Sequence, residues 1–215
     1  MIYLLWSTCR TDVFKKVHKT WMDNAVMPEN IKTYVAVDSQ EEADELKDYD
    51  VRVVDNPNKG VVKPIYAMTK DLRLEREDII VVPSDDFYTF PNWDMYLHEN
   101  MHEFYGVLKI NDGHMKDIIS MPVMKYPALE QMNHVIYHPT YDHMFCDKEL
   151  HSTAYELGIC HAVPLSDPIF EHKHWAHSTR DKDKHDDIND AGYNAGKELY
   201  IKRNNLSIGE RLEVI

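Results

Sequence analysis

The first half of the chain alternates short apolar runs with longer polar stretches that carry apolar residues at helical spacing. Short apolar runs bounded by turn signals are typical of buried strands, and recurrence every three to four residues is typical of amphipathic helices. On this basis we predict strands at residues 2–6, 32–39, 51–57 and 78–83, and helices at residues 11–25, 40–48 and 61–74.

Strands that alternate with helices favour a parallel sheet covered by helices. The predicted fold class is therefore α/β, a single Rossmann-like domain with a mostly parallel central sheet flanked by helices. In open sheets of this kind, ligands bind beside the carboxyl ends of the strands. Three polar segments fall at such ends, namely Asp38, the turn NPNKG with Asn58 and Lys59, and the triplet Ser84–Asp86. We expect them to line one crevice.

The second half of the chain is less regular. We predict a loop and helix at residues 90–104, a strand at 105–112, a helix that ends at Gly158, a strand at 159–165, a charged loop at 172–187 and a final helix at 189–204. No internal repeat, low-complexity tract or domain boundary is visible in the sequence. Residues 1–215 are therefore predicted to form one domain.

The composition favours an ordered globule with an acidic surface. Hydrophobic residues make up 43% of the chain and aromatic residues 11%, which is more than disordered chains carry. The net charge is −13 with His neutral, from 37 acids and 24 bases. A field of this sign repels phosphate backbones, so non-specific binding of nucleic acid is not expected of the surface as a whole.

The cysteines and the N-terminus indicate a reducing, aqueous compartment. Cys9, Cys146 and Cys160 are too few and too scattered for a disulfide framework or a CxxC zinc site. The apolar stretch within MIYLLWSTCR is too short for a signal peptide or a membrane span. We therefore expect a soluble, cytoplasmic protein with reduced cysteines.

The fourth predicted strand runs directly into two adjacent acids, in the stretch VVPSDDFYTF. The carboxylates of Asp85 and Asp86 repel each other and cannot be buried without a positive partner. A divalent cation with oxygen ligands is such a partner, and Mg²⁺ or Mn²⁺ would bridge the acids to substrate phosphates. Acids are also common in turns, where they cap loops and helices, so the triplet alone leaves this simpler interpretation open.

Two other segments favour the interpretation as a metal and phosphate site. The stretch EHKHWAH brings His172, His174 and His177 together, and imidazole is a good ligand for manganese or zinc, although a solvated His-rich loop is the alternative. The stretch NPNKGVVKP predicts a tight turn that leads to Lys63 at a helix start, where backbone N–H groups and ammonium groups bind diphosphates. An ordinary connection between a strand and a helix has the same pattern.

The stretch FCDKELH places Asp147 and Glu149 at the N-terminal end of a predicted helix. The helix dipole favours acids at this position, which is sufficient to explain them. The functional alternative is that Asp147 is a general base that takes a proton from an acceptor hydroxyl.

In their order and spacing, these segments resemble the GT-A type glycosyltransferases over most of residues 1–175. The resemblance is carried by STCR after the first strand, Asp38 after the second, Asn58 to Gly60 after the third, SDD after the fourth, PNWDMYL at a helix start, and FCDKEL before a helix that ends in ELG. It implies a family-2-like enzyme that uses nucleotide sugars. Residues 1–104 would bind the nucleotide sugar, residues 105–188 would bind the acceptor and carry out catalysis, and residues 189–215 would be a C-terminal helix and tail.

The residues that the resemblance implies for donor binding are Thr8, Arg10, Asp38, Lys63, Ser84 and Asp85. Thr8 and Arg10 would line the nucleotide pocket, and Asp38 would accept a hydrogen bond from the base or ribose. Lys63 would contact the nucleotide or its diphosphate. Asp85 would lie near the sugar or ribose, in a DxD position where Ser84 replaces the first acid of the family pattern.

The resemblance also implies a metal site and a catalytic base. Asp86 would be the direct metal ligand, joined by His172 or His174. Asp147 would be the base of an inverting transfer, and Cys146 stands where the family usually has a Glu before the base.

The implied activity is transfer of a sugar from a nucleoside-diphosphate sugar, most simply a UDP-sugar, to an acceptor hydroxyl, with Mn²⁺ or Mg²⁺ as cofactor. The acceptor could be a glycan, a lipid-linked sugar or a modified DNA base. A nucleotidyltransferase and a metal-dependent hydrolase or nuclease are alternatives that would use the same acidic and His residues. A non-catalytic lectin-like or regulatory module would use the same crevice. The absence of a Gly-rich loop directly after the first strand counts against the nucleotidyltransferase.

Overall fold

The computed structural model describes residues 1–57, 60–115, 117–163 and 168–214. In its first half, every predicted strand and helix is present. These elements are β1 (Ile2–Ser7), α1 (Thr11–Asp23), β2 (Ile31–Val37), α2 (Gln40–Glu45), β3 (Asp50–Val53), α3 (Val62–Thr69) and β4 (Ile79–Val81), with a short 3-10 helix η1 (Pro28–Asn30) before β2. Pro64 lies in the first turn of α3, where its missing N–H leaves no helical hydrogen bond unmade.

The second half contains more elements than the sequence predicts. They are β5 (Phe87–Thr89), α4 (Trp93–Met101), β6 (Val107–Lys109), β7 (Val123–Lys125), α5 (Tyr126–Gln131), α6 (Cys146–Glu156), β8 (Cys160–Ala162), β9 (Phe170–His172), η2 (Trp175–His177), α7 (Lys184–Ala191), α8 (Tyr193–Arg203) and α9 (Ile208–Leu212). Among the described residues, no helix is both long enough and apolar enough to cross a bilayer.

Two segments of the C-terminal region differ from their predictions. The segment 172–187, predicted as a loop, contains the end of β9, the 3-10 helix η2 and the start of α7. The final helix, predicted at 189–204, is two helices that meet at Gly192, a residue type with low helix propensity. The short strands β5 and β9 exist because they pair with each other in an antiparallel ribbon, a contact that no local pattern reveals.

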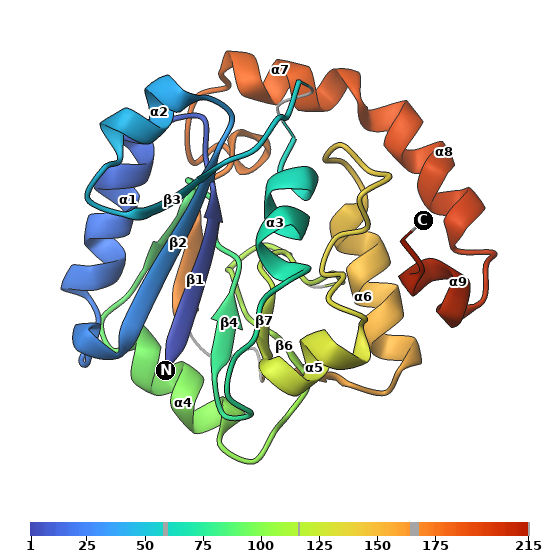
Figure 1. Ribbon diagram of the computed structural model, residues 1–215, viewed down its shortest axis with the longest axis horizontal. Helices are drawn as coiled ribbons and strands as arrows, with labels where there is room; N and C mark the ends of the chain where they lie inside the picture. Colours follow the sequence, from blue (N-terminus) through green and yellow to red (C-terminus); the bar gives the residue numbers. More distant parts are fainter. Residues whose placement is uncertain (58–59, 116, 164–167, 215) are drawn as a thin grey trace.

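The central sheet has the strand order β3-β2-β1-β4-β7-β6-β8 (Figure 1). Strand β1 pairs in parallel with β2 and β4, β2 pairs in parallel with β3, and β7 is antiparallel to both of its neighbours. The sheet is therefore mostly parallel, as predicted. The chain leaves β1 for β2 on one side and later returns to β4 on the other side. Such a reversal opens a crevice at the carboxyl ends of the two central strands.

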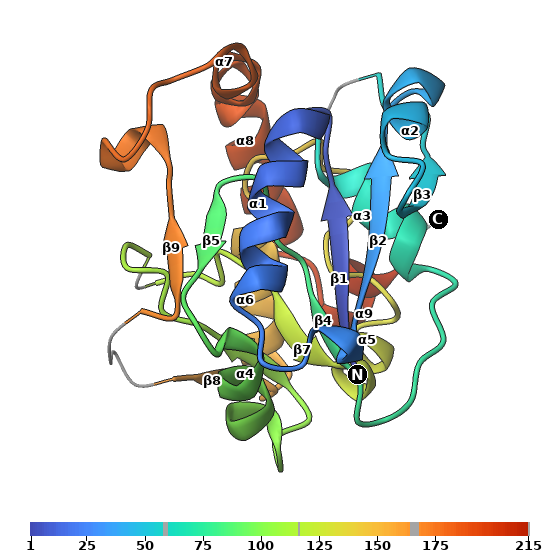
Figure 2. The ribbon, with the colours of Figure 1, turned by 90° about the vertical axis from the view of Figure 1, so that its left-hand side faces the viewer.

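Helices cover both faces of the sheet (Figures 1 and 2). Leu4 and Trp6 of β1 belong to the core on the side of α1, α2 and α4, whereas Leu5 belongs to the core on the side of α3, α5 and α6. Side chains of a strand alternate between the faces, and both faces here are buried. This explains why the strands in the sequence are nearly continuous apolar runs.

One half-buried imidazole makes the stability of this fold dependent on pH. His18 of α1 lies beside Phe14 and Tyr49, with ring centroids 5.4 and 5.1 Å away, and its Nε2 is 2.9 Å from the Thr33 hydroxyl oxygen. Burial lowers the pKa of His18 from 6.5 to about 4. The unfolded chain therefore binds a proton at pH values where the native protein does not, so this part of the stability is present above pH 6.5 and is lost as the pH falls toward 4.

We expect the wild-type protein to lose on the order of 2 kcal/mol more free energy of unfolding between pH 7 and pH 4.5 than the variant His18→Gln, which has no imidazole to protonate. Urea titrations at a series of pH values measure this difference. The variant His102→Gln, at an exposed position, is the matched control and should keep the wild-type pH profile. Parallel pH profiles for the wild type and His18→Gln would contradict the assignment.

Candidate functional site

A cavity of about 450 Å³ lies at the carboxyl ends of the central strands. The sequence-predicted residues that line it are Thr8, Arg10, Asp38, Ser84, Asp85, Asp86, Asp147, His172 and His174. Lys63 is in the first turn of α3 and is not among the lining residues. Asn58 and Lys59 lie outside the described residues. The residues from the ends of β2 and β4 therefore share one crevice, as the parallel sheet predicts.

Asp85 is a buried carboxylate that ties the ends of β1 and β4 together. Its Oδ1 accepts a hydrogen bond from Trp6 Nε1 at 2.8 Å, and its Oδ2 accepts one from the Thr8 hydroxyl at 2.8 Å. Arg10 Nε donates to the same Oδ2 at 3.3 Å. Burial raises the pKa of Asp85, and these donors oppose the rise. Both oxygens of Asp85 already have donors within the protein, and its expected contact with the sugar or ribose stays a prediction.

Asp86, the next residue, is held by a different set of partners. The Ser84 hydroxyl donates to its Oδ1, His172 Nε2 lies 3.5 Å from its Oδ2, and Arg180 Nη2 lies 4.0 Å from the same oxygen. Burial by itself would raise the pKa of Asp86, but His172 and Ser84 lower it to about 2. Asp86 is therefore an ionised carboxylate at the wall of the cavity.

His172 lies between two carboxylates. Its Nδ1 is 3.4 Å from Oδ2 of Asp112, and its ring stacks on Phe87 with centroids 4.2 Å apart. Burial alone would lower the pKa of His172, but Asp112 and Asp86 raise it to about 9. Asp112 is fixed in turn, because its Oδ1 accepts backbone N–H groups of His114 at 2.9 Å and Met115 at 2.7 Å. The result is a chain of carboxylate, imidazolium and carboxylate.

Asp112 was not predicted as a site residue, although the sequence places it at the end of a predicted strand. Asp112 closes the predicted strand 105–112, so it stands in the same position relative to its strand as Asp38 does to the second strand. The partner of Asp112 is His172 at the end of β9, a strand that the sequence does not predict.

The cavity offers a cation two side-chain donors that are side by side, Asp86 Oδ2 and His172 Nε2. His174 lies next to them, with its ring centroid 5.3 Å from that of His172, and its Nδ1 accepts the backbone N–H of Ala176 at 3.3 Å. Within the described part of the chain, no three His, Cys, Asp or Glu side chains are grouped to hold a metal ion. A pair of donors suits Mg²⁺ or Mn²⁺ when substrate phosphates and water complete the coordination.

Asp147 reaches the cavity from the N-terminus of α6. The residue before α6, Phe145, has a left-handed φ of 71°, which is uncommon for a bulky side chain. Tyr193 and Tyr200 of α8 pack against its ring, with centroids 5.0 and 6.0 Å away. Asp147 is half-buried, burial raises its pKa, and its Oδ1 accepts the N–H of Lys148 at 2.8 Å. Packing of α8 thus positions the turn that carries Asp147.

Helix α8 approaches this turn closely at Gly196. A Cβ at Gly196 would lie 2.6 Å from the carbonyl oxygen of Met144, which is closer than real Cβ contacts. The position therefore requires glycine because of this close approach.

Near β2, a buried amide fixes the position of Asp38. Asn56 Nδ2 donates to Asp38 Oδ1 at 2.9 Å and to the Gly60 carbonyl at 2.8 Å. The segment after β3 is thereby joined to the end of β2. Asn56 lies in the predicted turn NPNKG, but the sequence does not indicate that its amide contacts Asp38.

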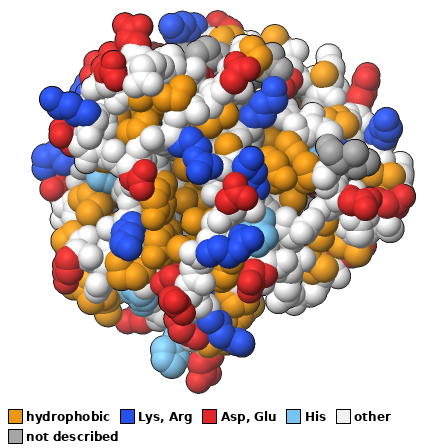
Figure 3. Space-filling view, viewed as in Figure 1, with side chains coloured by type: hydrophobic (Ala, Val, Ile, Leu, Met, Phe, Trp, Pro, Cys, Tyr) orange, Lys and Arg blue, Asp and Glu red, His pale blue; other side chains and the backbone are white. Residues whose placement is uncertain are grey.

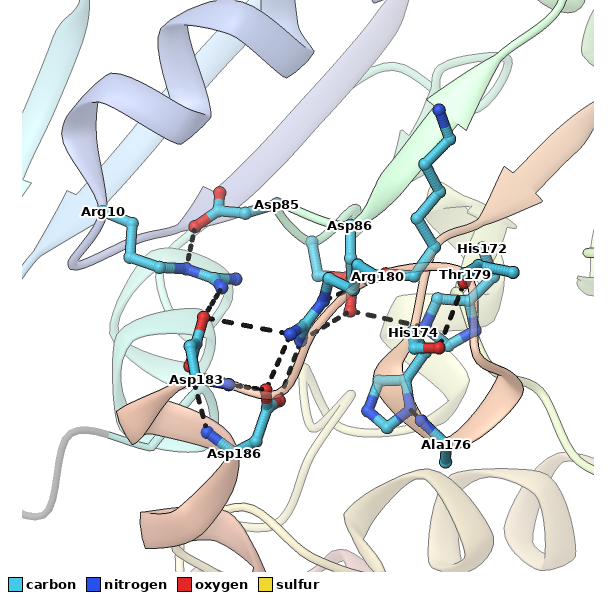
Figure 4. Close-up of polar contacts among 12 residues, drawn as sticks. Arg10, Asp85, Asp86, His172, His174, Ala176, Thr179, Arg180, Asp183 and Asp186 are labelled. Carbon is cyan, nitrogen blue, oxygen red and sulfur yellow. Dashed lines mark hydrogen bonds and ion pairs between the residues drawn. The ribbon is translucent and has the colours of Figure 1, made fainter.

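The segment from Arg180 into α7 also lines the cavity, and Figure 4 shows its carboxylates beside Arg10 and Arg180. Arg10 Nη1 donates to Asp183 Oδ2 at 3.0 Å, and Arg180 binds both oxygens of Asp186 at 2.7 and 2.8 Å. Figures 1 and 2 show α7 beyond the carboxyl end of β1. These residues were predicted as a charged loop, because the sequence RDKDKHDD does not indicate a partner that lies more than a hundred residues earlier in the chain.

No protein-family description matches the sequence, and no curated protein matches it. Solved structures do match. The structure of S. aureus TarS 1-349 in complex with UDP has a TM-score of 0.61 at 11% identity, with coverage of 79% of this chain and 59% of that chain. The structure of S. aureus TarS has a TM-score of 0.58 at 10% identity, with coverage of 80% and 36%.

TarS is a GT-A type glycosyltransferase, and the fold of this chain is of the same type. The sequence prediction of a GT-A type α/β fold is confirmed. The chain spans less than two thirds of the length of either TarS structure.

We expect Thr8→Val to lower the free energy of unfolding by about 1–3 kcal/mol, because a buried oxygen of Asp85 loses its hydroxyl donor while the side-chain volume stays the same. Urea titration at neutral pH measures the loss. The matched control is Thr20→Val, whose hydroxyl donates to the Val17 carbonyl within its own helix, and it should change the stability by no more than about 0.5 kcal/mol. Equal losses in both variants would refute a special role of the Thr8 hydroxyl.

Proposed function

We propose that this protein transfers a sugar from a nucleoside-diphosphate sugar to an acceptor hydroxyl. The most direct support is that three side chains line one cavity of this GT-A type fold. They are the cation Arg10, the ionised Asp86 and the half-buried Asp147. The cavity volume of about 450 Å³ is in the range of small-molecule sites. UDP in the complex with TarS supports a UDP-sugar as the donor.

In this proposal the nucleoside binds toward β2. Asp38, positioned by Asn56, would accept a hydrogen bond from the base or ribose. Thr8 and Arg10 follow β1 and would lie beside the nucleotide, with Arg10 supplying positive charge toward the diphosphate. Lys63 is a further expected contact from α3.

We propose that Asp86 and His172 would hold Mn²⁺ or Mg²⁺, with His174 as the neighbouring imidazole. The donor set fits because Asp86 is ionised and His172 presents Nε2 toward it. Asp112 keeps the opposite nitrogen of the ring in place, which is the usual arrangement behind a metal-binding His. When bound, such a cation supplies positive charge to the departing diphosphate. The pKa of His172 is lowered by burial but raised to about 9 by the two carboxylates, so binding of a cation to its Nε2 would release a proton.

Asp147 is the proposed base. Burial raises its pKa, which brings a carboxylate closer to the basicity that general-base catalysis requires. It would take the proton of the acceptor hydroxyl as that oxygen bonds to the anomeric carbon and the bond to the diphosphate breaks, with inversion at the carbon.

The surface favours a glycan or a lipid-linked sugar over DNA as the acceptor. The face shown in Figure 3 carries acidic and basic side chains interspersed, without a continuous basic area. Together with the net charge of −13, this gives little attraction for a phosphate backbone.

We expect UDP with Mn²⁺ to raise the melting temperature of the wild-type protein by about 5 °C at saturating concentrations, because the ligand binds the folded state only. Asp86→Ala should lose the part of this shift that depends on Mn²⁺, since it removes the carboxylate ligand. Thermal shift assays with UDP, with and without Mn²⁺, measure both effects. Asp55→Ala, at an exposed acid after β3, is the control. A full metal-dependent shift in Asp86→Ala would contradict the proposed metal site.

We expect Asp147→Asn to reduce sugar transfer by about 10²–10⁴-fold while UDP affinity stays within about twofold, because the base contributes to the chemical step only. The assay is a panel of nucleotide sugars and acceptors with release of nucleoside diphosphate as the readout. The neighbouring exposed acid gives the control Asp142→Asn, which should retain activity. Wild-type release of free sugar without any acceptor would instead indicate a hydrolase.

A further inference from the structure

Two guanidinium groups face the cavity from different parts of the chain. Arg10 follows β1 and has 23% of its side chain exposed, and Arg180 follows β9 with 22% exposed. Arg180 Nε donates to the Lys173 carbonyl at 3.1 Å, which holds the guanidinium near Asp86. Arginine in such positions binds carboxylates and phosphates through the same planar arrangement of N–H donors.

Both guanidinium groups are paired with carboxylates from one segment. Asp183 Oδ2 lies 3.0 Å from Arg10 Nη1 and 3.9 Å from Arg180 Nη1. Asp186 binds Arg180 through both of its oxygens and is 5% exposed. In Figure 4 the two carboxylates lie together on the side of the guanidinium groups that is away from Asp85 and Asp86. They thus present two anionic groups, close together, to two arginines.

The charge balance leaves no place for a diphosphate while this segment is in position. The guanidinium groups of Arg10 and Arg180 already face three carboxylates of the protein, those of Asp85, Asp183 and Asp186. A diphosphate carries at least two further negative charges. It can bind to the guanidinium groups only if carboxylates leave them.

We propose that Arg10 and Arg180 together bind the diphosphate of the donor, and that Asp183 and Asp186 occupy the same two guanidinium groups in the free protein. Binding of the diphosphate then displaces the segment 183–191 from the cavity wall. The identity of the diphosphate as part of a nucleotide sugar rests on the proposed function, whereas the anion site and its internal competitors rest on the contacts of these four residues.

Helix α7, which carries Asp186, also offers a matched control on its outer face. Lys182 Nζ pairs with Asp187 Oδ1 and with Asp190 Oδ2, each at 2.7 Å, and Asp187 has 70% of its side chain exposed. Asp186→Asn and Asp187→Asn therefore make the same change of charge on adjacent residues of one helix. The first frees Arg180, and the second does not.

The test is calorimetric titration of the full chain with inorganic pyrophosphate and, separately, with UDP, in EDTA so that metal ions do not contribute. We expect Asp186→Asn and Asp183→Asn to lower the dissociation constant for pyrophosphate about fivefold, because an internal competitor is removed. Asp187→Asn should stay within about twofold of the wild type. Arg180→Ala should raise the dissociation constant at least about tenfold.

Equal affinities in Asp186→Asn and Asp187→Asn, or wild-type affinity in Arg180→Ala, would overturn the inference. Hydrogen exchange of the wild type gives a second test that needs no variant: the amides of residues 184–191 should exchange faster with pyrophosphate bound, and unchanged or slower exchange would also overturn it. If UDP binds normally but the Asp variants have no effect, this inference fails and the proposed function stands. If the variants strengthen pyrophosphate binding but no nucleotide sugar binds, the anion site stands and the proposed function fails.

Discussion

The site depends on one buried carboxylate, that of Asp85. Two parallel strands have no hydrogen bonds to each other beyond their last paired residues, so the loops that follow β1 and β4 need another link. Asp85 provides it, because its two oxygens accept from Trp6, Thr8 and Arg10. A buried carboxylate is costly unless it is fully hydrogen-bonded, so these three donors and the acid form a unit in which each group requires the others. The unit fixes where the backbone leaves the sheet.

From that fixed point, the adjacent acid takes a different role. Asp86 contacts His172, and His172 contacts the buried Asp112. Both oxygens of Asp85 thus accept hydrogen bonds from the protein itself, whereas Asp86 lies on the cavity wall with an imidazole beside it. The repulsion between two neighbouring carboxylates is therefore relieved in this structure by guanidinium and imidazolium groups that come from distant parts of the chain.

The sequence was sufficient for the strands of the first half and for the polar residues at their ends, because both follow from local patterns. Apolar runs mark β1, β2 and β4, and the geometry of a parallel sheet brings Asp38 and Asp86 to one crevice. The interaction partners of these residues could not be predicted from the sequence. The contact between Arg10 and Asp183 joins residues 173 positions apart, and its existence depends on the path of a segment whose alternating charges equally suit a solvated loop.

Residues from both halves of the chain line the cavity, so the site forms only when the two halves pack together. The first half supplies the strand ends with Arg10, Asp38 and Asp86, and the second half supplies Asp147. The turn that carries Asp147 is held by α8, which packs on Phe145 and approaches Met144 at Gly196. Helix α8 is in turn anchored because Arg203 donates to the buried Glu149 of α6, at 2.8 to 3.1 Å. A buried ion pair of this kind tolerates little displacement, since either charge alone would be left without a partner. The position of the proposed base is therefore set by the ion pair between Arg203 of α8 and Glu149, which is two residues after Asp147 in α6, and by the same C-terminal region whose first helix, α7, lines the cavity.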